Sequence, residues 1–308
     1  MKAIEAPRFR SDKKGLLRHC EDRLNLWRAF TGLPLLLLPA ITGMPSGWVG
    51  IFYGATVWFL LNDMNFVLHQ HVHYPLTTSN RLNRVLDILM SCVTGMSAYN
   101  WRQHHLLRHH KKDDAWSGDA FLAGKRYSWL GSIVYSVRYA VVMFVYPLVE
   151  ALVKGAIVGK TAPFNFRAAF FEQMAIVAIM TALIVRTPEF YSWYYFLVYF
   201  FTAKTDYDNH VGCDESDFGF SNNTVNPIYN EVRNNFGYHT AHHYFPGAHW
   251  TKLPLLHGRI VAKIPSARIE HRWWTGSLSP PLLFHLLQNL GRSLRFGLLR
   301  KIRYEVRG

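Results

Sequence analysis

The chain has 308 residues, half of them apolar, and a formal net charge of +14. This length predicts one or two domains, and the charge does not indicate nucleic acid, because the basic residues flank apolar stretches as they do in proteins that meet an anionic membrane surface. The three cysteines, Cys20, Cys92 and Cys213, have no CxxC spacing, which excludes an iron–sulfur or rubredoxin-like centre, so electrons for any redox chemistry would come from another protein.

The first part of the chain predicts a membrane hairpin. Residues 1–28 are polar and basic, and they predict a cytosolic or interfacial helix rather than a removable signal peptide. No charged residue occurs between Ala29 and Leu61, a tract too long for one span of about 20 residues. Proline and glycine interrupt its middle, so two spans are predicted, at about 30–44 and 47–68.

The rest of the chain alternates between polar and apolar segments. Residues 76–127 hold eight Lys or Arg and are predicted to stay outside the bilayer, since one charge at mid-bilayer costs about 2.5–3.5 kcal/mol. Residues 127–154 are apolar but interrupted by charge, and predict a helix lying along the interface. Two further spans are predicted at about 168–185 and 190–205.

Together these segments predict an all-α integral membrane protein, with one domain over residues 1–308 and about four transmembrane helices in two hairpins. A helical cap would comprise residues 69–167 and 206–308. The excess of Lys and Arg in the cap places it on the cytosolic side. Residues 281–303 show a basic amphipathic pattern that is typical of a surface-lying helix.

Three histidine clusters and one isolated histidine supply candidate metal ligands, because imidazole is the commonest metal ligand and suits iron, zinc, copper and nickel. Residues three or four apart share a helix face, so two imidazoles of each cluster are predicted to point in one direction. These pairs are His69/His73, His105/His109 and His239/His242. A zinc site needs only three or four protein ligands, so the nine candidates are too many for one ion and about right for two. The nine are His69, His73, His105, His109, His110, His210, His239, His242 and His243.

Other polar residues near the clusters are candidates for supporting roles. His71, His104 and His249 are spare imidazoles. Side chains that could orient the ligands are Asp63, Asp114, Asp206, Asp208 and Asn235.

Other classes of protein also use histidine-rich segments. A non-catalytic membrane zinc-binding or transport protein is an alternative, since histidine-rich tracts bind zinc. A transporter is expected to place its ligands near the middle of its spans, whereas these histidines lie at span ends and beyond. A zinc hydrolase is disfavoured by the surplus of ligands and by the absence of an HExxH motif.

The clusters resemble those of the integral-membrane fatty acid desaturase and hydroxylase superfamily, which includes bacterial alkane monooxygenases. Its pattern is HxxxH, then HxxHH or HxxxHH, then HxxHH, and the resemblance covers about residues 50–260. His210 resembles the extra histidine that the family places between the second and third boxes. The matching residues are His69 and His73, then His105, His109 and His110, then His239, His242 and His243.

This resemblance implies two non-haem iron ions held by the nine histidines, O₂ as co-substrate, and oxidation of C–H bonds in a fatty acyl chain. Desaturation is the expected outcome, with hydroxylation or decarboxylation to a terminal alkene as alternatives. The setting would be the lipid bilayer of a bacterial inner membrane, with the metal site on the cytosolic face. Electrons would come from a separate donor such as a ferredoxin or rubredoxin with its reductase, and the basic surface of the chain suits an acidic donor.

Overall fold

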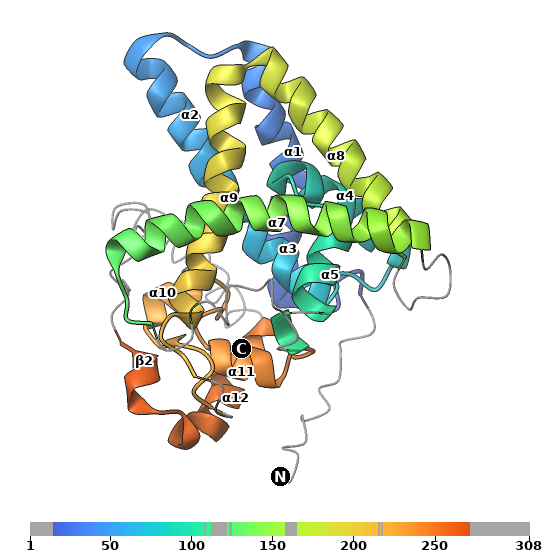
Figure 1. Ribbon diagram of the computed structural model, residues 1–308. Coiled ribbons are helices and arrows are strands. Elements are labelled where there is room, and N and C mark those ends of the chain that lie inside the picture. The colour runs from blue at the N-terminus through green and yellow to red at the C-terminus, as the bar shows by residue number, and fades with distance from the viewer. Residues whose placement is uncertain are drawn as a thin grey trace, which may run out of the picture.

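A computed structural model describes residues 15–107, 109–111, 122, 125–157, 165–214, 216 and 218–271 (Figure 1). Within these residues the chain is mostly helical and has almost no sheet. The α-helices are α1 (Arg23–Thr42), α2 (Gly47–Leu61), α3 (Met64–His73), α4 (Asn80–Thr94), α5 (Ala98–Leu107), α7 (Trp129–Ile157), α8 (Phe166–Arg186), α9 (Pro188–His210), α10 (Pro227–Val232), α11 (His239–Tyr244) and α12 (Leu253–Ile260). Short 3₁₀ turns are η1 (Cys20–Asp22), η2 (His109–Lys111), η4 (Trp250–Lys252), η5 (Val261–Lys263) and η6 (Ser266–Arg268), and the strands β1 (Asn223–Thr224) and β2 (Ile269–Glu270) pair in parallel.

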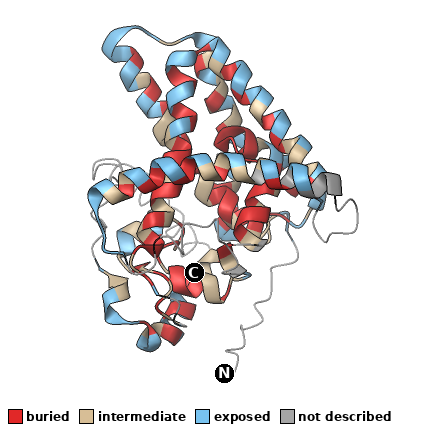
Figure 2. Ribbon diagram, viewed as in Figure 1, coloured by how far each residue is buried: buried red, intermediate tan, exposed pale blue. Residues whose placement is uncertain are grey.

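The molecule has a bundle of long helices at one end and a group of short elements at the other. Helices α1, α2, α8 and α9 extend toward the top of Figure 1, and α10 to α12 lie at the bottom. Helix α7 runs across the bundle and packs on α8 and α9. Buried residues concentrate where α3, α4, α5 and α9 meet, whereas α2 is largely exposed (Figure 2).

Four helical segments are long and apolar enough to cross a membrane, and they confirm the predicted all-helical membrane fold. Large apolar side chains on them are exposed, for example Trp48 and Val185 at 77% each. Such surface fits lipid rather than water. The segments are Cys20–Thr42, Gly47–His73, Trp129–Glu150 and Phe166–Arg186. The predicted span at about 190–205 belongs to α9, which is not among these four segments, and it stays a prediction.

Helix α7 contains most of the segment 127–154 that is predicted to lie along the membrane interface. Most of α7 meets the length and composition of a span, but the helix crosses α9 and meets the lower end of α8 (Figure 1). A helix that lies across the long helices in this way has the orientation that an interfacial helix requires. The position of α7 along the interface stays a prediction. Interfacial helices are also predicted at 1–28 and 281–303, of which residues 1–14 and 281–303 lie outside the described residues. Within the described part of the first segment, η1 is followed by α1, which begins at Arg23.

The predicted span 47–68 lies within the candidate span Gly47–His73, which consists of α2 and α3 with a short turn between them. The Asn62 side chain donates to the Phe59 carbonyl at 2.7 Å. The Asp63 carboxylate lies 3.0 Å from the Arg233 guanidinium and 3.5 Å from that of Arg28. These polar contacts lie at the short turn between α2 and α3, which contains neither the proline nor the glycine that often marks a helix break.

Local sequence sets the ends of the helices that carry the second cluster. The Ser79 hydroxyl accepts from the Leu82 amide at 3.3 Å and caps α4. Gly95 ends α4 with a φ of 75°, a left-handed conformation that glycine adopts without steric cost. A short turn then leads into α5, which lies against α3, α4 and α8.

Candidate metal centre

The described structure brings all nine candidate ligands together at the inner end of the helical bundle. They come from five elements that are far apart in the sequence. Helix α3 carries His69 and His73, α5 carries His105, η2 carries His109 and His110, the end of α9 carries His210, and α11 carries His239, His242 and His243.

Eight of the nine form two groups whose ring nitrogens converge. Within each group, one nitrogen of every ring lies within 4.8 Å of the others. The first group is His69, His73, His105 and His242, and the second is His109, His210, His239 and His243.

His110 lies between the two groups. Its Nε2 is 3.1 Å from the Nε2 of His73 and 3.0 Å from that of His105, both in the first group. Its ring centroid is 4.4 Å from that of His243 in the second group. The ninth histidine therefore contacts both groups.

The structure corrects the predicted pairing of imidazoles. His105 and His109 belong to different groups, because α5 ends at Leu107 and His109 lies in a 3₁₀ turn. His239 and His242 are also separated, and His239 instead shares a group with His243, four residues on. The two groups are adjacent, so the single short helix α11 contributes histidines to both of them.

The distances between ring nitrogens fit metal coordination. The Nε2 atoms are 2.8 Å apart for His69 and His105, and 3.1 Å apart for His210 and His239. Two nitrogens that bind one ion at about 2.0–2.1 Å and at right angles lie roughly 2.9 Å apart. The Nε2 of His242 is buried and has no hydrogen-bond partner among the described residues, as expected of an atom that faces an ion. The residues present therefore fit a pair of metal ions.

The electrostatics of the site favour neutral imidazole, the form that binds metals. Burial, and after it the proximity of other histidines, lowers the pKa of five candidate ligands well below 6.5. These five are His105, His110, His239, His242 and His243.

Among the side chains predicted to orient the ligands, Asp206 lies nearest to one of them. Its carboxylate is 4.0 Å from the Nδ1 of His109 and accepts a hydrogen bond from Tyr135. The structure instead places Asp63 beside two arginines, Asp208 beside Lys204, and Asn235 against the Trp250 carbonyl. Asp114 lies outside the described residues. A backbone group that the sequence did not indicate, the Phe220 carbonyl, lies 3.1 Å from the Nδ1 of His210.

Two of the three spare histidines make hydrogen bonds away from the metal centre. His104 contacts the Tyr139 hydroxyl at 2.9 Å. His249 contacts the buried Asp22 carboxylate at 2.9 Å and stacks on His19. These contacts indicate structural roles.

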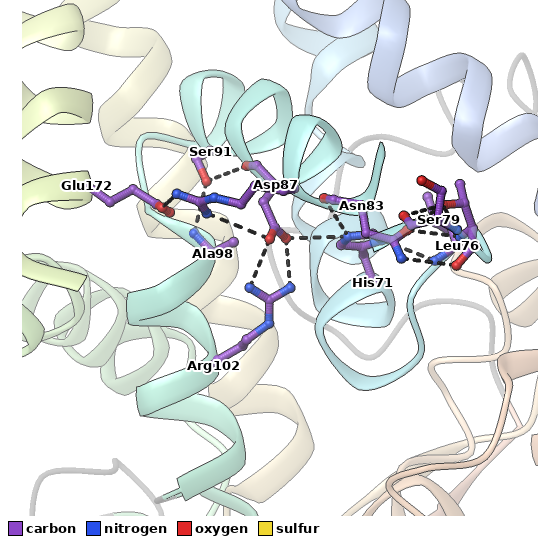
Figure 3. A network of polar contacts seen from close by, with 11 residues as sticks. His71, Leu76, Ser79, Asn83, Asp87, Ser91, Ala98, Arg102 and Glu172 are labelled. Atoms are coloured by element: carbon purple, nitrogen blue, oxygen red, sulfur yellow. Dashed lines mark hydrogen bonds and ion pairs between the residues drawn. The ribbon is translucent and has the colours of Figure 1, made fainter. Parts of the chain in front are cut away.

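The third spare histidine, His71, belongs to a polar network that fixes α3 to α4 and α5 (Figure 3). The Asp87 carboxylate accepts two hydrogen bonds from Arg102, at 2.7 and 3.1 Å, and lies 3.3 Å from the Nε2 of His71. Arg84 extends the network to Glu172 on α8. Burial would raise the pKa of Asp87, but the hydrogen bonds from His71 and Arg102 outweigh it and hold that pKa below its usual value. The network therefore positions the helix that carries His69 and His73.

A cavity adjoins both groups of histidines. Four candidate ligands, His69, His105, His109 and His239, form part of its wall. The remainder of the wall is apolar in part, with Trp58, Phe66, Trp101, Met143 and Phe201. Its charged residues are two bases and two acids, Lys204, Arg233, Asp206 and Asp208. A ligand in this cavity would lie directly against the candidate metal ligands.

The fold and the site define a helical membrane protein in which two adjacent groups of histidines that could hold metal ions lie beside a partly apolar cavity. A family model described as fatty acid desaturase matches residues 42–275. The chain therefore belongs to the fatty acid desaturase family. Searches of curated proteins and of solved structures found no match.

Proposed function

We propose that the protein catalyses the O₂-dependent oxidation of C–H bonds in a fatty acyl chain, with desaturation as the outcome. The observation that carries this proposal is the convergence of nine histidines beside a partly apolar cavity in a member of the desaturase family. Two iron ions would supply the activation of O₂, a role that zinc cannot take because it has no redox chemistry.

The residues of the chain have distinct parts in this proposal. The two four-histidine groups would each hold one ion, with His110 between them. Trp101 stacks on the His105 ring, with centroids 5.5 Å apart and planes 3° apart, and restricts that ligand's rotation. The apolar wall would align the acyl chain and exclude water. Hydroxylation and alkene-forming decarboxylation begin with the same hydrogen abstraction and are the alternatives.

We further propose that the metal centre faces the cytosol at a bacterial inner membrane. The excess of Lys and Arg in the segments that carry the histidines supports this orientation. Electrons would arrive from an acidic ferredoxin, or from a rubredoxin, with its reductase, because the chain is strongly basic and has no CxxC motif.

Metal analysis and product analysis of the full-length protein test the proposal. We expect about two iron ions per chain, and conversion of labelled fatty acids to unsaturated products when O₂ and a ferredoxin system are present. Zinc in place of iron, without oxygen uptake, would contradict the proposal and favour a non-catalytic zinc-binding or transport protein. Hydroxylated products or terminal alkenes would instead select one of the alternatives.

A further inference from the structure

The cavity beside the metal centre has a polar character that a tunnel for hydrocarbon alone does not need. We infer that it binds the carboxylate of a free fatty acid with the head group inward, beside the metal centre, and the tail directed to the lipid. This inference rests on the proposed function and specifies its substrate class. Two basic side chains in the wall, Lys204 and Arg233, would receive the carboxylate.

Lys204 has hydrogen-bonding capacity that its surroundings do not use. The residue is 3% exposed, and its ammonium group donates to the Asp208 carboxylate at 2.5 Å. An ammonium group can donate three hydrogen bonds, and Asp208 is its only partner within the described ranges. Two donors therefore remain for an acceptor in the cavity.

Arg233 supplies a second buried donor and a positive charge in excess of its partner. Its Nη1 donates to Asp63 at 3.0 Å, while its Nε is buried without a partner in the described part of the chain. Asp63 is shared with Arg28, at 3.5 Å, so two guanidinium groups face one carboxylate. Buried charges are rarely left unpaired, and a ligand carboxylate would complete the pairing.

The metal centre would favour the same ligand chemistry. All nine candidate ligands are histidines and none is a carboxylate, so neutral imidazoles leave the charge of bound metal ions uncompensated. Two carboxylates also line this cavity. Asp208 is paired with Lys204, and Asp206 accepts from Tyr135 and approaches His109. An additional anion in the cavity would therefore be attracted to the metal ions as well as to Lys204 and Arg233.

A second, apolar cavity provides a path for the tail. It lies between α2 and α9, and its wall includes Met44, Phe190 and Trp193. Trp58 and Leu197 line both cavities, so the two adjoin. Trp193 is 65% exposed and Phe52 on the neighbouring helix is 72% exposed, which places the outer end of this path among lipid-facing side chains. The acid would enter from the bilayer.

The head-inward orientation determines which carbons lie near the metal centre. Lys204 precedes His210 by six residues on α9, or about 9 Å along a helix axis. The histidine wall and the two basic side chains share one cavity. The C–H bonds closest to the metal ions are then those near the carboxylate rather than those in the middle of the chain.

Equilibrium binding tests this inference without turnover. Palmitic acid, its methyl ester and palmitoyl-CoA are titrated into the full-length protein in lipid nanodiscs, and each result is corrected for partition into empty discs. Hydrogen bonds to a charged group predict that the acid binds about ten to a hundred times more tightly than the ester. The variants Lys204→Met and Arg233→Met are each expected to weaken acid binding by about tenfold without changing ester binding.

Two further variants control for charge and for folding. Lys204→Arg keeps the positive charge and is expected to retain the preference for the acid. Arg259 is exposed on α12 and is not part of the cavity wall. The variant Arg259→Met is therefore expected to bind all three probes as the unmodified protein does. The acid-to-ester ratio within the unmodified protein needs no variant and keeps the inference testable if Lys204→Met does not fold.

Equal binding of acid and ester, or tighter binding of palmitoyl-CoA than of the acid, would overturn the head-group site. In that case oxidation of an ester or thioester would leave the proposed function intact. Conversely, a preference for the acid without oxidation products from any lipid would uphold the carboxylate site and overturn the proposed function.

Discussion

At the scale of single residues, His242 differs from the other candidate ligands. Each of the other eight has its Nε2 against another histidine, whereas the Nε2 of His242 is buried and has no partner in the described structure. The Nε2 of His110 faces two ring nitrogens at once, and one hydrogen on that atom cannot serve both. Coordination of metal ions by these rings would account for both observations.

Replacing His242 with alanine removes one candidate ligand of the first group. Because its Nε2 has no hydrogen-bond partner in the described structure, the replacement leaves no former partner of that atom unpaired. We expect His242→Ala to lose iron and to lower turnover by more than about a hundredfold, because even residues behind the ligands contribute tenfold to a hundredfold to metal affinity. Iron per chain and product formation measure the effect. His271 is exposed, and His271→Ala should retain both. Full iron occupancy in His242→Ala would contradict the ligand assignment.

The spacing of histidines in the sequence identified all nine that converge, but not how they divide. Helical periodicity paired His105 with His109 and His239 with His242, and the structure separates both pairs. The division depends on where α5 ends and on how α11 meets α3 and α9. These are tertiary features that spacing along one helix does not contain.

At the scale of helices, Asp87 connects α4 to the helices that carry the first two histidine clusters. Asp87→Ala leaves the Arg102 guanidinium and the buried His71 ring without their shared acceptor. Breaking a buried ion pair of this kind costs about 3 kcal/mol. We expect a lower midpoint of thermal unfolding and, because α3 is less firmly held, roughly tenfold weaker iron retention.

A surface carboxylate provides the matched comparison for Asp87. The Asp214 side chain is 57% exposed and lies 3.9 Å from Arg268. Asp214→Ala should change stability by less than about 1 kcal/mol, since exposed ion pairs contribute little. If both variants unfolded at the same temperature, the network around Asp87 would have no special role in fixing α3.

The sequence predicted one helix boundary in the first part of the chain and missed another. The proline and glycine between Ala29 and Leu61 correctly marked a helix boundary, now seen between α1 and α2. The break at Asn62 and Asp63 was missed, because it depends on a side chain bonding to its own helix and on arginines distant in the sequence.

At the scale of the whole molecule, the burial of so many imidazoles makes stability depend on pH. His105, His110, His239, His242 and His243 each have a pKa well below 6.5 in the folded chain. The unfolded chain therefore binds more protons than the folded one below about pH 6.5. This stabilisation is fully present above that pH and is lost as the pH falls, by up to about 1.4 kcal/mol per pH unit for each histidine.

Thermal unfolding of the metal-free protein from pH 8 to pH 5 measures this dependence. We expect the midpoint to be flat above about pH 7 and to fall steadily below about pH 6.5. In the iron-loaded protein, bound metal excludes the protons, so acid should also release iron. A midpoint that rises on acidification would contradict the neutral state of the histidines.

The distribution of ligands over the elements also affects how the metals are acquired. Helix α11 contributes His242 to the first group and His239 and His243 to the second, while the segment from α5 to η2 contributes His105 and His109 in the same divided way. An ion bound in either group would therefore immobilise backbone that also carries the ligands of its neighbour. Loading should consequently be cooperative, so that chains with an empty pair and chains with a full pair outnumber those that hold a single ion.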